Sequence, residues 1–273
     1  MRLQLPDGLI YAVVVGGLLV ASIAWRGSAN APSTPPPVPG LGQTPIASFS
    51  PFAADRVLPA TPKTETAAGT AFSIGDAGLW LTARHVIDGC DQIGVVVAEG
   101  RGVAASIAAR RGDLAVLRTE GGAPALPLAP SAPRAGQQVF HPGFPQGAPG
   151  EVASQLLGRQ TLRVHGRGVA AAEVLAWAEN GRTDGLRGSL AGLSGAPVLD
   201  ATGRVVGVTL AESPRRGRLY SSTPRDVREM LSLARAPTAG ASGAQPLSVD
   251  SYGRAADDLR RQLRVVQVVC LAA

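Results

Sequence analysis

The sequence predicts a mainly β protein built from antiparallel barrels. Between residues 69 and 218, short apolar runs are broken by Gly, Pro and Asp, and strands of this length and spacing are typical of barrels. The chain of 273 residues contains 34 Gly and 22 Pro, which supply many turns, and 45% hydrophobic residues, which suffice for a full core. The predicted strands include Ala71–Ile74, Leu79–Thr82, Ile93–Val97, Ala115–Leu117, Val139–Phe140 and Val205–Leu210.

The N-terminus carries an uncharged, mostly apolar run from Gly8 to Trp25. At about 1.5 Å per residue the run reaches roughly 27 Å, near the minimum for a membrane span and longer than a secretory signal core. A cleavage signature at 29–31 is followed by Pro32, whose imide bond should be cut poorly. We therefore predict that residues 1–27 form an uncleaved signal anchor, with a cleaved signal peptide as the alternative.

The rest of the chain divides by composition. Residues 28–62 are rich in Pro and Ala and are predicted to form a stiff, extended linker. Residues 63–236 hold the predicted barrels and a helix at Pro224–Ala234, and residues 237–273 form a tail that should pack on them. Within the tail, the pattern predicts a helix over Tyr252–Leu263 and an apolar strand over Val265–Leu271.

The charge balance does not indicate a nucleic-acid partner. The net charge is +6, but Lys63 is the one Lys among 26 basic residues, and the Arg residues are spread along the chain. Aromatic residues make up 4% of the sequence, too few for a base-stacking platform. We therefore read the basic composition as a general usage bias and predict no nucleic-acid binding.

The most informative motif is Gly-Leu-Ser-Gly-Ala-Pro-Val at residues 192–198. Its glycines allow a tight turn that leaves the Ser194 hydroxyl uncovered and lets the N–H groups of Gly192 and Ser194 point to one spot. Because a serine hydroxyl is a poor nucleophile without a base, the motif predicts a histidine and a carboxylate elsewhere. His85 in Leu-Thr-Ala-Arg-His-Val and Asp113 in Gly-Asp-Leu-Ala-Val-Leu supply them.

The other histidines and nearby carboxylates fit these roles less well. His141 precedes Pro142 in an expected turn and His165 lies in an Arg-rich stretch, so both are expected at the surface. Asp88 and Asp91 lie too close to His85 in sequence to come from an orienting strand.

These motifs, in the order His, Asp, Ser, resemble those of trypsin-like serine proteases, and within them the bacterial HtrA-like branch. Further matches are Gly-Thr-Ala-Phe at 69–72 and Gly-Phe-Pro-Gln-Gly at 143–147. The resemblance implies two six-stranded antiparallel barrels and a serine endopeptidase that needs no cofactor. It also implies Ser194 as nucleophile, His85 as general base, Asp113 as its orienting carboxylate, and the N–H groups of Gly192 and Ser194 as the oxyanion hole.

The resemblance also implies the position of the substrate pocket. Its walls should include Leu190, Ala191, Leu210, Ala211 and Glu212, most of which favour a small aliphatic substrate side chain. Glu212 would attract Arg or Lys from inside the pocket, but on the rim it would be solvated and neutral in effect. Leu193 replaces the Asp that pairs with a new N-terminus in the digestive enzymes, so activation by such cleavage is not expected.

The family also implies protein or peptide substrates and an exported enzyme, here expected as a single-pass protein of the bacterial inner membrane with its protease domain in the periplasm. HtrA-like proteins usually carry a PDZ domain after the protease, and the 237–273 tail is too short for one. Nothing in the sequence indicates an oligomeric state.

Two other functions remain in competition with the enzyme. A non-catalytic scaffold could share the fold, be anchored in the membrane and bind peptides without cutting them. An α/β-hydrolase esterase would need Gly-x-Ser-x-Gly followed by Asp and then His, but Ala196 replaces the last Gly and no His follows Ser194.

Cysteine and histidine usage indicates a disulfide rather than a metal site. Cys90 and Cys270 are the two cysteines, and an exported chain often pairs them, which would fix the tail on the first barrel. The alternative is two unpaired buried cysteines. No metal site is expected, because the histidines and cysteines lack the short paired spacings of metal ligands.

Overall fold

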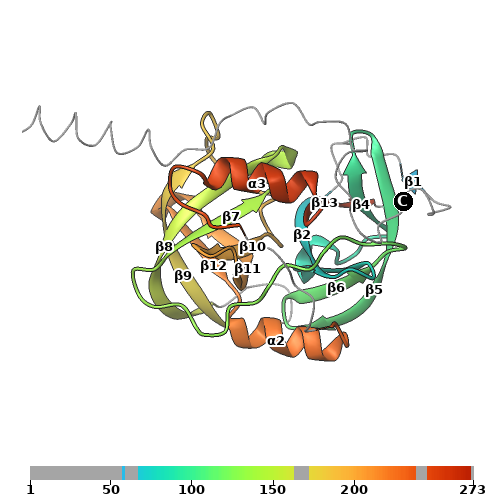
Figure 1. The fold of residues 1–273 in the computed structure, drawn as a ribbon, viewed down its shortest axis with the longest axis horizontal. Helices are drawn as coiled ribbons and strands as arrows, with labels where there is room; N and C mark the ends of the chain where they lie inside the picture. The colour runs from blue at the N-terminus through green and yellow to red at the C-terminus, as the bar shows by residue number, and fades with distance from the viewer. Residues whose placement is uncertain (1–56, 59–66, 163–171, 238–244, 272–273) are drawn as a thin grey trace, which may run out of the picture.

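The computed structural model describes residues 57–58, 67–162, 172–237 and 245–271. Their strands form two closed antiparallel barrels that lie side by side, with helix α3 across one end and α2 across the other (Figure 1). This confirms the predicted mainly β fold with two six-stranded barrels.

The first barrel is closed by a strand from the C-terminal tail. Around the barrel the order is β5-β4-β13-β2-β3-β6, with β6 pairing back to β5, while β1 (Val57–Leu58) adds to the outside of β5. The strands are β2 (Ala67–Gly75), β3 (Leu79–Ala83), β4 (Gln92–Ala98), β5 (Arg101–Arg111), β6 (Leu114–Arg118) and β13 (Val265–Leu271).

The second barrel has the order β10-β11-β12-β9-β8-β7. Its strands are β7 (Gln138–Gly143), β8 (Gly150–Leu162), β9 (Ala172–Arg182), β10 (Pro197–Asp200), β11 (Val205–Ser213) and β12 (Arg218–Ser221). Short 3-10 turns lie at η1 (Arg84–Val86), η2 (Pro145–Gly147) and η3 (Pro214–Arg216), and the helices are α2 (Pro224–Leu233) and α3 (Tyr252–Arg261).

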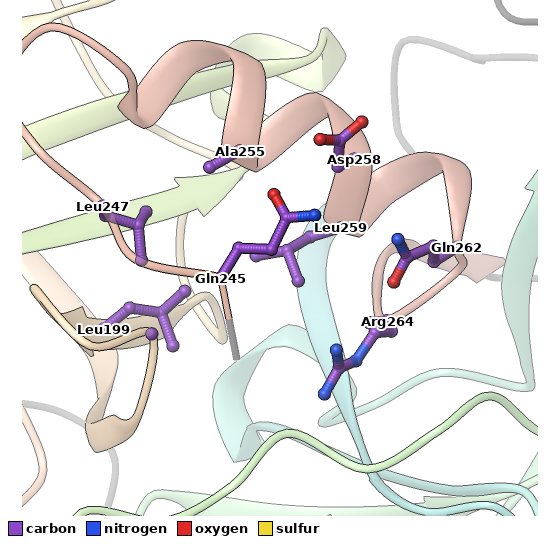
Figure 2. Close-up of a pocket in the computed structure, with 9 residues that line it drawn as sticks. Leu199, Gln245, Leu247, Ala255, Asp258, Leu259, Gln262 and Arg264 are labelled. Carbon is purple, nitrogen blue, oxygen red and sulfur yellow. The ribbon is translucent and has the colours of Figure 1, made fainter. Parts of the chain in front are cut away.

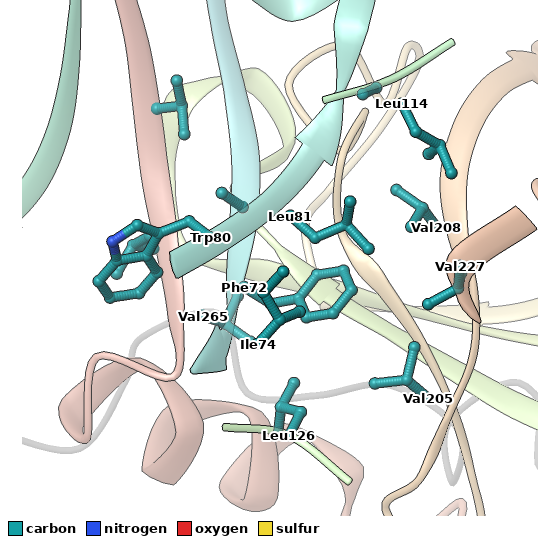
Figure 3. Close-up of a cluster of buried hydrophobic side chains, with 14 of the residues drawn as sticks. Phe72, Ile74, Trp80, Leu81, Leu114, Leu126, Val205, Val208, Val227 and Val265 are labelled. Atoms are coloured by element: carbon teal, nitrogen blue, oxygen red, sulfur yellow. The ribbon is translucent and has the colours of Figure 1, made fainter. Parts of the chain in front are cut away.

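The hydrophobic core joins the two barrels into one packed unit. Phe72, Leu81 and Leu114 from the first barrel share a buried cluster with Val208 from β11 and Val227 from α2 (Figure 3). Such burial contributes about 25 cal/mol per Å² of apolar surface removed from water. The apolar runs recognised in the sequence therefore hold the two barrels, and the residues at their junction, in a fixed relation.

The tail is integrated into the fold. Strand β13 pairs with β2 on one side and β4 on the other, and a disulfide joins Cys270 at its end to Cys90. Helix α3 packs on β7 through the stacked rings of Tyr252 and Phe140, whose centroids are 5.2 Å apart.

The cavity beneath α3, which Leu247 and Leu259 help to line, has a volume of about 10 Å³ (Figure 2). That volume holds at most one water molecule, so α3 is closely seated on the second barrel.

The predicted tail elements, Tyr252–Leu263 and Val265–Leu271, correspond to α3 and β13, and the helix predicted at Pro224–Ala234 corresponds to α2. Among the described residues, no helix is long and apolar enough to cross a membrane. The predicted anchor at residues 8–25 lies outside that part of the chain, as does nearly all of the 28–62 linker.

Candidate active site

His85 and Asp113 meet because β3 and β6 are paired. Ala83 at the end of β3 lies opposite Leu114 at the start of β6, so the residues just beyond them are neighbours. The Nδ1 of His85 lies 2.9 Å from Oδ2 of Asp113 and 3.1 Å from Oδ1, and the backbone N–H of His85 also donates to Oδ1 at 3.1 Å. A carboxylate accepts hydrogen bonds, so the proton belongs on Nδ1 and Nε2 is left free to accept one.

Asp113 is the carboxylate that bonds the His85 ring. Asp88 is closer to His85 in sequence, but its carboxylate accepts a hydrogen bond from Arg84 Nε at 3.1 Å. The side chains of His85 and Asp113 are each about one-third exposed, at 31% and 33%, so a substrate can reach the imidazole.

Ser194 lies in a tight loop just before β10, on the second barrel. Gly192 and Gly195 have φ values of +96° and +90°, which side-chain-bearing residues rarely adopt. A Cβ at Gly192 would overlap the Phe144 carbonyl oxygen, and one at Gly195 would overlap the Thr70 carbonyl oxygen. The glycines of the motif are therefore required by both backbone conformation and space.

The loop leaves two backbone donors free at the predicted oxyanion hole. In the fully described stretch from Leu190 to Ala196, every backbone N–H donates to a protein acceptor except those of Gly192 and Ser194. These are the two N–H groups that the sequence motif predicts for the oxyanion hole, and they are available to a ligand oxygen.

The two halves of the site meet at strand β2. The Thr70 N–H donates to the Ser194 carbonyl at 2.8 Å, and the Thr70 hydroxyl donates to the Gly192 carbonyl at 2.8 Å. A Cβ at Gly69 would lie 2.6 Å from a Val86 methyl carbon and 3.1 Å from the Ser194 carbonyl oxygen. The turn that carries His85 and the loop that carries Ser194 thus approach each other across a glycine.

In this structure the Ser194 hydroxyl donates to the Leu210 carbonyl at 3.5 Å rather than to His85. That bond is long, and hydrogen bonds at catalytic sites often shorten or change partner only when substrate binds. Leu210, a predicted wall of the substrate pocket, is thereby placed directly beside Ser194.

The two predicted walls of the substrate pocket are tied together by Glu212. Its carboxylate accepts from the Ser189 hydroxyl at 2.5 Å and from the Leu190 N–H at 2.9 and 2.8 Å. Ala191 lies at the same wall, where its N–H donates to the Ser189 hydroxyl at 3.1 Å. Ala211 lies on β11 between Leu210, which accepts the Ser194 hydrogen bond, and Glu212.

His141 contradicts the expectation of a surface position. It is fully buried on β7, with Nδ1 2.9 Å from the Thr209 hydroxyl and Nε2 2.7 Å from the Ser154 hydroxyl. Pro142 does not end the strand, and both ring nitrogens find partners on other strands of the barrel, Thr209 on β11 and Ser154 on β8. Burial lowers the pKa of His141 to about 3, so the ring is held neutral. His165 lies outside the described residues.

Burial of neutral His141 predicts a loss of stability in mild acid. Between its ordinary pKa of 6.5 and its folded-state pKa of about 3, the unfolded chain binds a proton that the folded chain does not. The free energy of unfolding should therefore fall as pH drops from about 6.5 toward 3, by up to roughly 1.4 kcal/mol per pH unit from this group. Urea midpoints at pH 7.0 and 4.5 should fall further for wild type than for His141→Gln. Equal falls would contradict the assignment.

Three residues of the site were not predicted individually. Thr70 and Gln146 lie in motifs that the sequence did single out, Gly-Thr-Ala-Phe and Gly-Phe-Pro-Gln-Gly. Thr70 bonds the Ser194 loop from the first barrel and Gln146 bonds it from the second, and the sequence does not show these contacts. Arg260, whose guanidinium donates to the Gly143 carbonyl of the second motif, lies in the tail and has no sequence signal. Among the described residues, no group of three or more His, Cys, Asp or Glu is arranged to hold a metal ion.

Two barrels that bring a His–Asp pair against a glycine-bounded serine define the architecture of a serine peptidase of the double-barrel class. The chain belongs to the trypsin-like peptidase domain family, whose model matches residues 69–208.

The chain is also similar to individual proteins. It is 31% identical to HhoA of Synechocystis sp., a candidate serine protease, over 57% of this chain and 40% of HhoA, so it spans less than half of that relative. The active form of the Rv3671c protease from M. tuberculosis has a TM-score of 0.52 at 20% identity, covering 66% of this chain and 76% of that one. The HtrA-type protease AlgW, solved with a decapeptide, has a TM-score of 0.50 at 22% identity, covering 61% and 51%. These two likenesses show the shared fold.

Proposed function

We propose that this chain is a serine endopeptidase of HtrA type that hydrolyses peptide bonds of proteins through Ser194, His85 and Asp113. The observation that carries the proposal is the pair of free N–H groups, at Gly192 and Ser194, in a loop placed against a His–Asp pair. Neither N–H has a protein acceptor in the described part of the chain, although those of Leu193 and Gly195 beside them do, so both donors remain for a substrate oxygen.

Each group has a step in the proposed reaction. His85, with its Nδ1 proton held by Asp113, takes the Ser194 proton at Nε2 as Oγ attacks the substrate carbonyl carbon. The N–H groups of Gly192 and Ser194 stabilise the negative charge that forms on the carbonyl oxygen. His85 then gives the proton to the leaving amine, and an acyl group stays on Ser194. Water next attacks the acyl carbon while His85 takes its proton, and His85 returns a proton to Ser194 Oγ as the acid product leaves.

The first test is hydrolysis of casein by the purified chain, with Asp113→Asn as a matched variant of nearly equal size. Loss of the carboxylate leaves His85 free to adopt the wrong tautomer, and we expect kcat to fall by about 10⁴-fold. Unfolding in urea should change little, because the pair is partly exposed. Wild type that binds casein without cutting it would favour the scaffold instead.

The pocket walls support a preference for a small aliphatic residue before the scissile bond. The Glu212 carboxylate is occupied by Ser189 and Leu190, so it ties the walls together rather than reaching for a basic substrate. We expect peptides with Ala or Val at this position to exceed those with Arg in kcat/KM by about tenfold or more. Faster cleavage after Arg, abolished by Glu212→Gln, would show that the carboxylate is the specificity group.

We further propose that the enzyme is held by its apolar segment, residues 8–25, in the bacterial inner membrane and acts on proteins in the periplasm. The length of that segment and the disulfide, which is typical of oxidising compartments, support this location. Carbonate extraction followed by N-terminal sequencing tests it. A soluble product that begins near Pro32 would replace the anchor with a cleaved signal peptide.

A further inference from the structure

We propose that Arg260, in the C-terminal helix α3, is a positioning residue that holds the oxyanion hole in its active geometry. It acts through the β7–β8 turn, defined here as residues 143–150. The inference rests on the proposed peptidase function and extends the machinery to a segment beyond the residues, 69–208, that the family model matches.

The β7–β8 turn contacts and hydrogen-bonds the Ser194 loop. The Gln146 N–H donates to the Ala191 carbonyl at 2.5 Å, and its side-chain amide donates to the carbonyls of Arg187 at 2.7 Å and Ser189 at 2.8 Å. The Phe144 carbonyl fills the space beside Gly192 that a Cβ would need. Gln146 has a φ of +56°, so the turn keeps a side-chain-bearing residue in a disfavoured conformation to make these contacts.

Arg260 holds both ends of this turn. Its Nη1 donates to the carbonyls of Gly143 and Gly150, each at 3.2 Å, while Nη2 donates to Glu151 at 2.7 Å and Asp257 at 2.6 Å. The side chain is 9% exposed. A guanidinium can serve these four acceptors at once because its donors form a rigid planar fork, which the ammonium of Lys lacks.

The turn borders a groove on the side that faces β4. The groove, of about 530 Å³, lies between Phe144, Gly147 and Pro149 of the turn and the end of β4. Arg260 lines the same groove, as does Gln267 of β13, whose amide donates to the Gly147 carbonyl at 3.3 Å. The two tail residues therefore add hydrogen bonds to the part of the turn that borders this groove.

A shift of the turn would reach the oxyanion hole directly. A Cβ at Gly143 would lie 2.7 Å from the Thr70 hydroxyl oxygen and 2.9 Å from a Leu193 methyl carbon, so the turn and the loop are in close contact. The Thr70 hydroxyl also bonds both sides, accepting from the Phe144 N–H at 3.1 Å and donating to the Gly192 carbonyl. Displacement of the turn should therefore move the Gly192 N–H while leaving the His85–Asp113 pair in place.

The test compares Arg260→Lys with Arg261→Lys, the same change at the next residue of α3, where Arg261 pairs with Asp258. A misplaced oxyanion donor weakens binding of the transition state more than of the substrate. We expect Arg260→Lys to lower kcat about tenfold with KM within twofold of wild type. The inhibition constant of a peptide boronate of matched sequence should rise by a similar factor. Arg261→Lys should change none of these.

Gln267→Leu, at a half-buried position, provides a second variant that does not depend on a buried charge. It should lower kcat about threefold with unchanged KM and an unchanged urea midpoint. Unchanged kcat in folded Arg260→Lys, or in Gln267→Leu should Arg260→Lys fail to fold, would overturn the proposal. A rise in KM with unchanged kcat would also overturn it. Absence of activity in wild type would instead refute the proposed peptidase function.

Discussion

Ser194→Ala is expected to lower kcat for peptide hydrolysis by about 10⁶-fold, because it removes the hydroxyl that is proposed to form the acyl intermediate. The residual rate should come from substrate binding and from the free N–H groups of Gly192 and Ser194. The Ser194 hydroxyl makes one long hydrogen bond, 3.5 Å to Leu210, so its removal should leave folding intact. Initial rates on a chromogenic peptide, with urea midpoints measured in parallel, check both statements.

A rate for Ser194→Ala within tenfold of wild type would place the catalytic nucleophile elsewhere. Ser189→Ala is the matched control, since this serine lies on the adjacent wall of the pocket and bonds Glu212. Its loss should change the preference among substrates more than the maximal rate.

Loss of the Cys90–Cys270 disulfide should cause the largest change in stability. The bond joins residues 180 positions apart, and the chain-entropy model gives such a loop about 5 kcal/mol of unfolding free energy. It fixes β13, which closes the first barrel between β2 and β4, to the segment that follows His85. Urea unfolding of Cys270→Ser, compared with wild type, should therefore show a lower midpoint.

The control for this prediction is reduction of the wild type. Dithiothreitol should lower the wild-type midpoint to that of Cys270→Ser and leave the variant unchanged. An identical wild-type midpoint with and without reductant would show that the bridge contributes no net stability.

The sequence predicted the parts of the fold whose signal is local. The apolar runs at β2, β3 and β6 are short and bounded by turn residues, and the helical spacing of α2 and α3 is regular. Strand β5 gave no such signal, because Arg101–Arg111 consists largely of Ala and Arg, and its side chains alternate between half-buried and exposed over much of its length. Its place in the sheet is decided by pairing with β4 and β6.

The site was predictable where chemistry demands particular residue types in a short frame. His85, Asp113 and Ser194 each lie in such a frame, and the structure places them at the junction of the barrels. The residues that hold the site in place do so through hydrogen bonds between distant segments, which the sequence does not show. Thr70 bonds the Ser194 loop from the other barrel, Gln146 donates to carbonyls of that loop, and Arg260 donates to the β7–β8 turn from the tail. His141 was misplaced for the same reason, since its partners Ser154 and Thr209 lie on separate strands.

The proposed function depends on the His85–Asp113 pair making the Ser194 hydroxyl an active nucleophile. Labelling with a fluorophosphonate probe, followed by peptide mapping, measures this most directly because the probe reacts with activated serines and needs no knowledge of the natural substrate. We expect one adduct, on Ser194, that is lost in Ser194→Ala and forms much more slowly in His85→Ala. Folded wild-type protein that takes up no label, or an equal labelling rate in His85→Ala, would show that the pair does not activate Ser194.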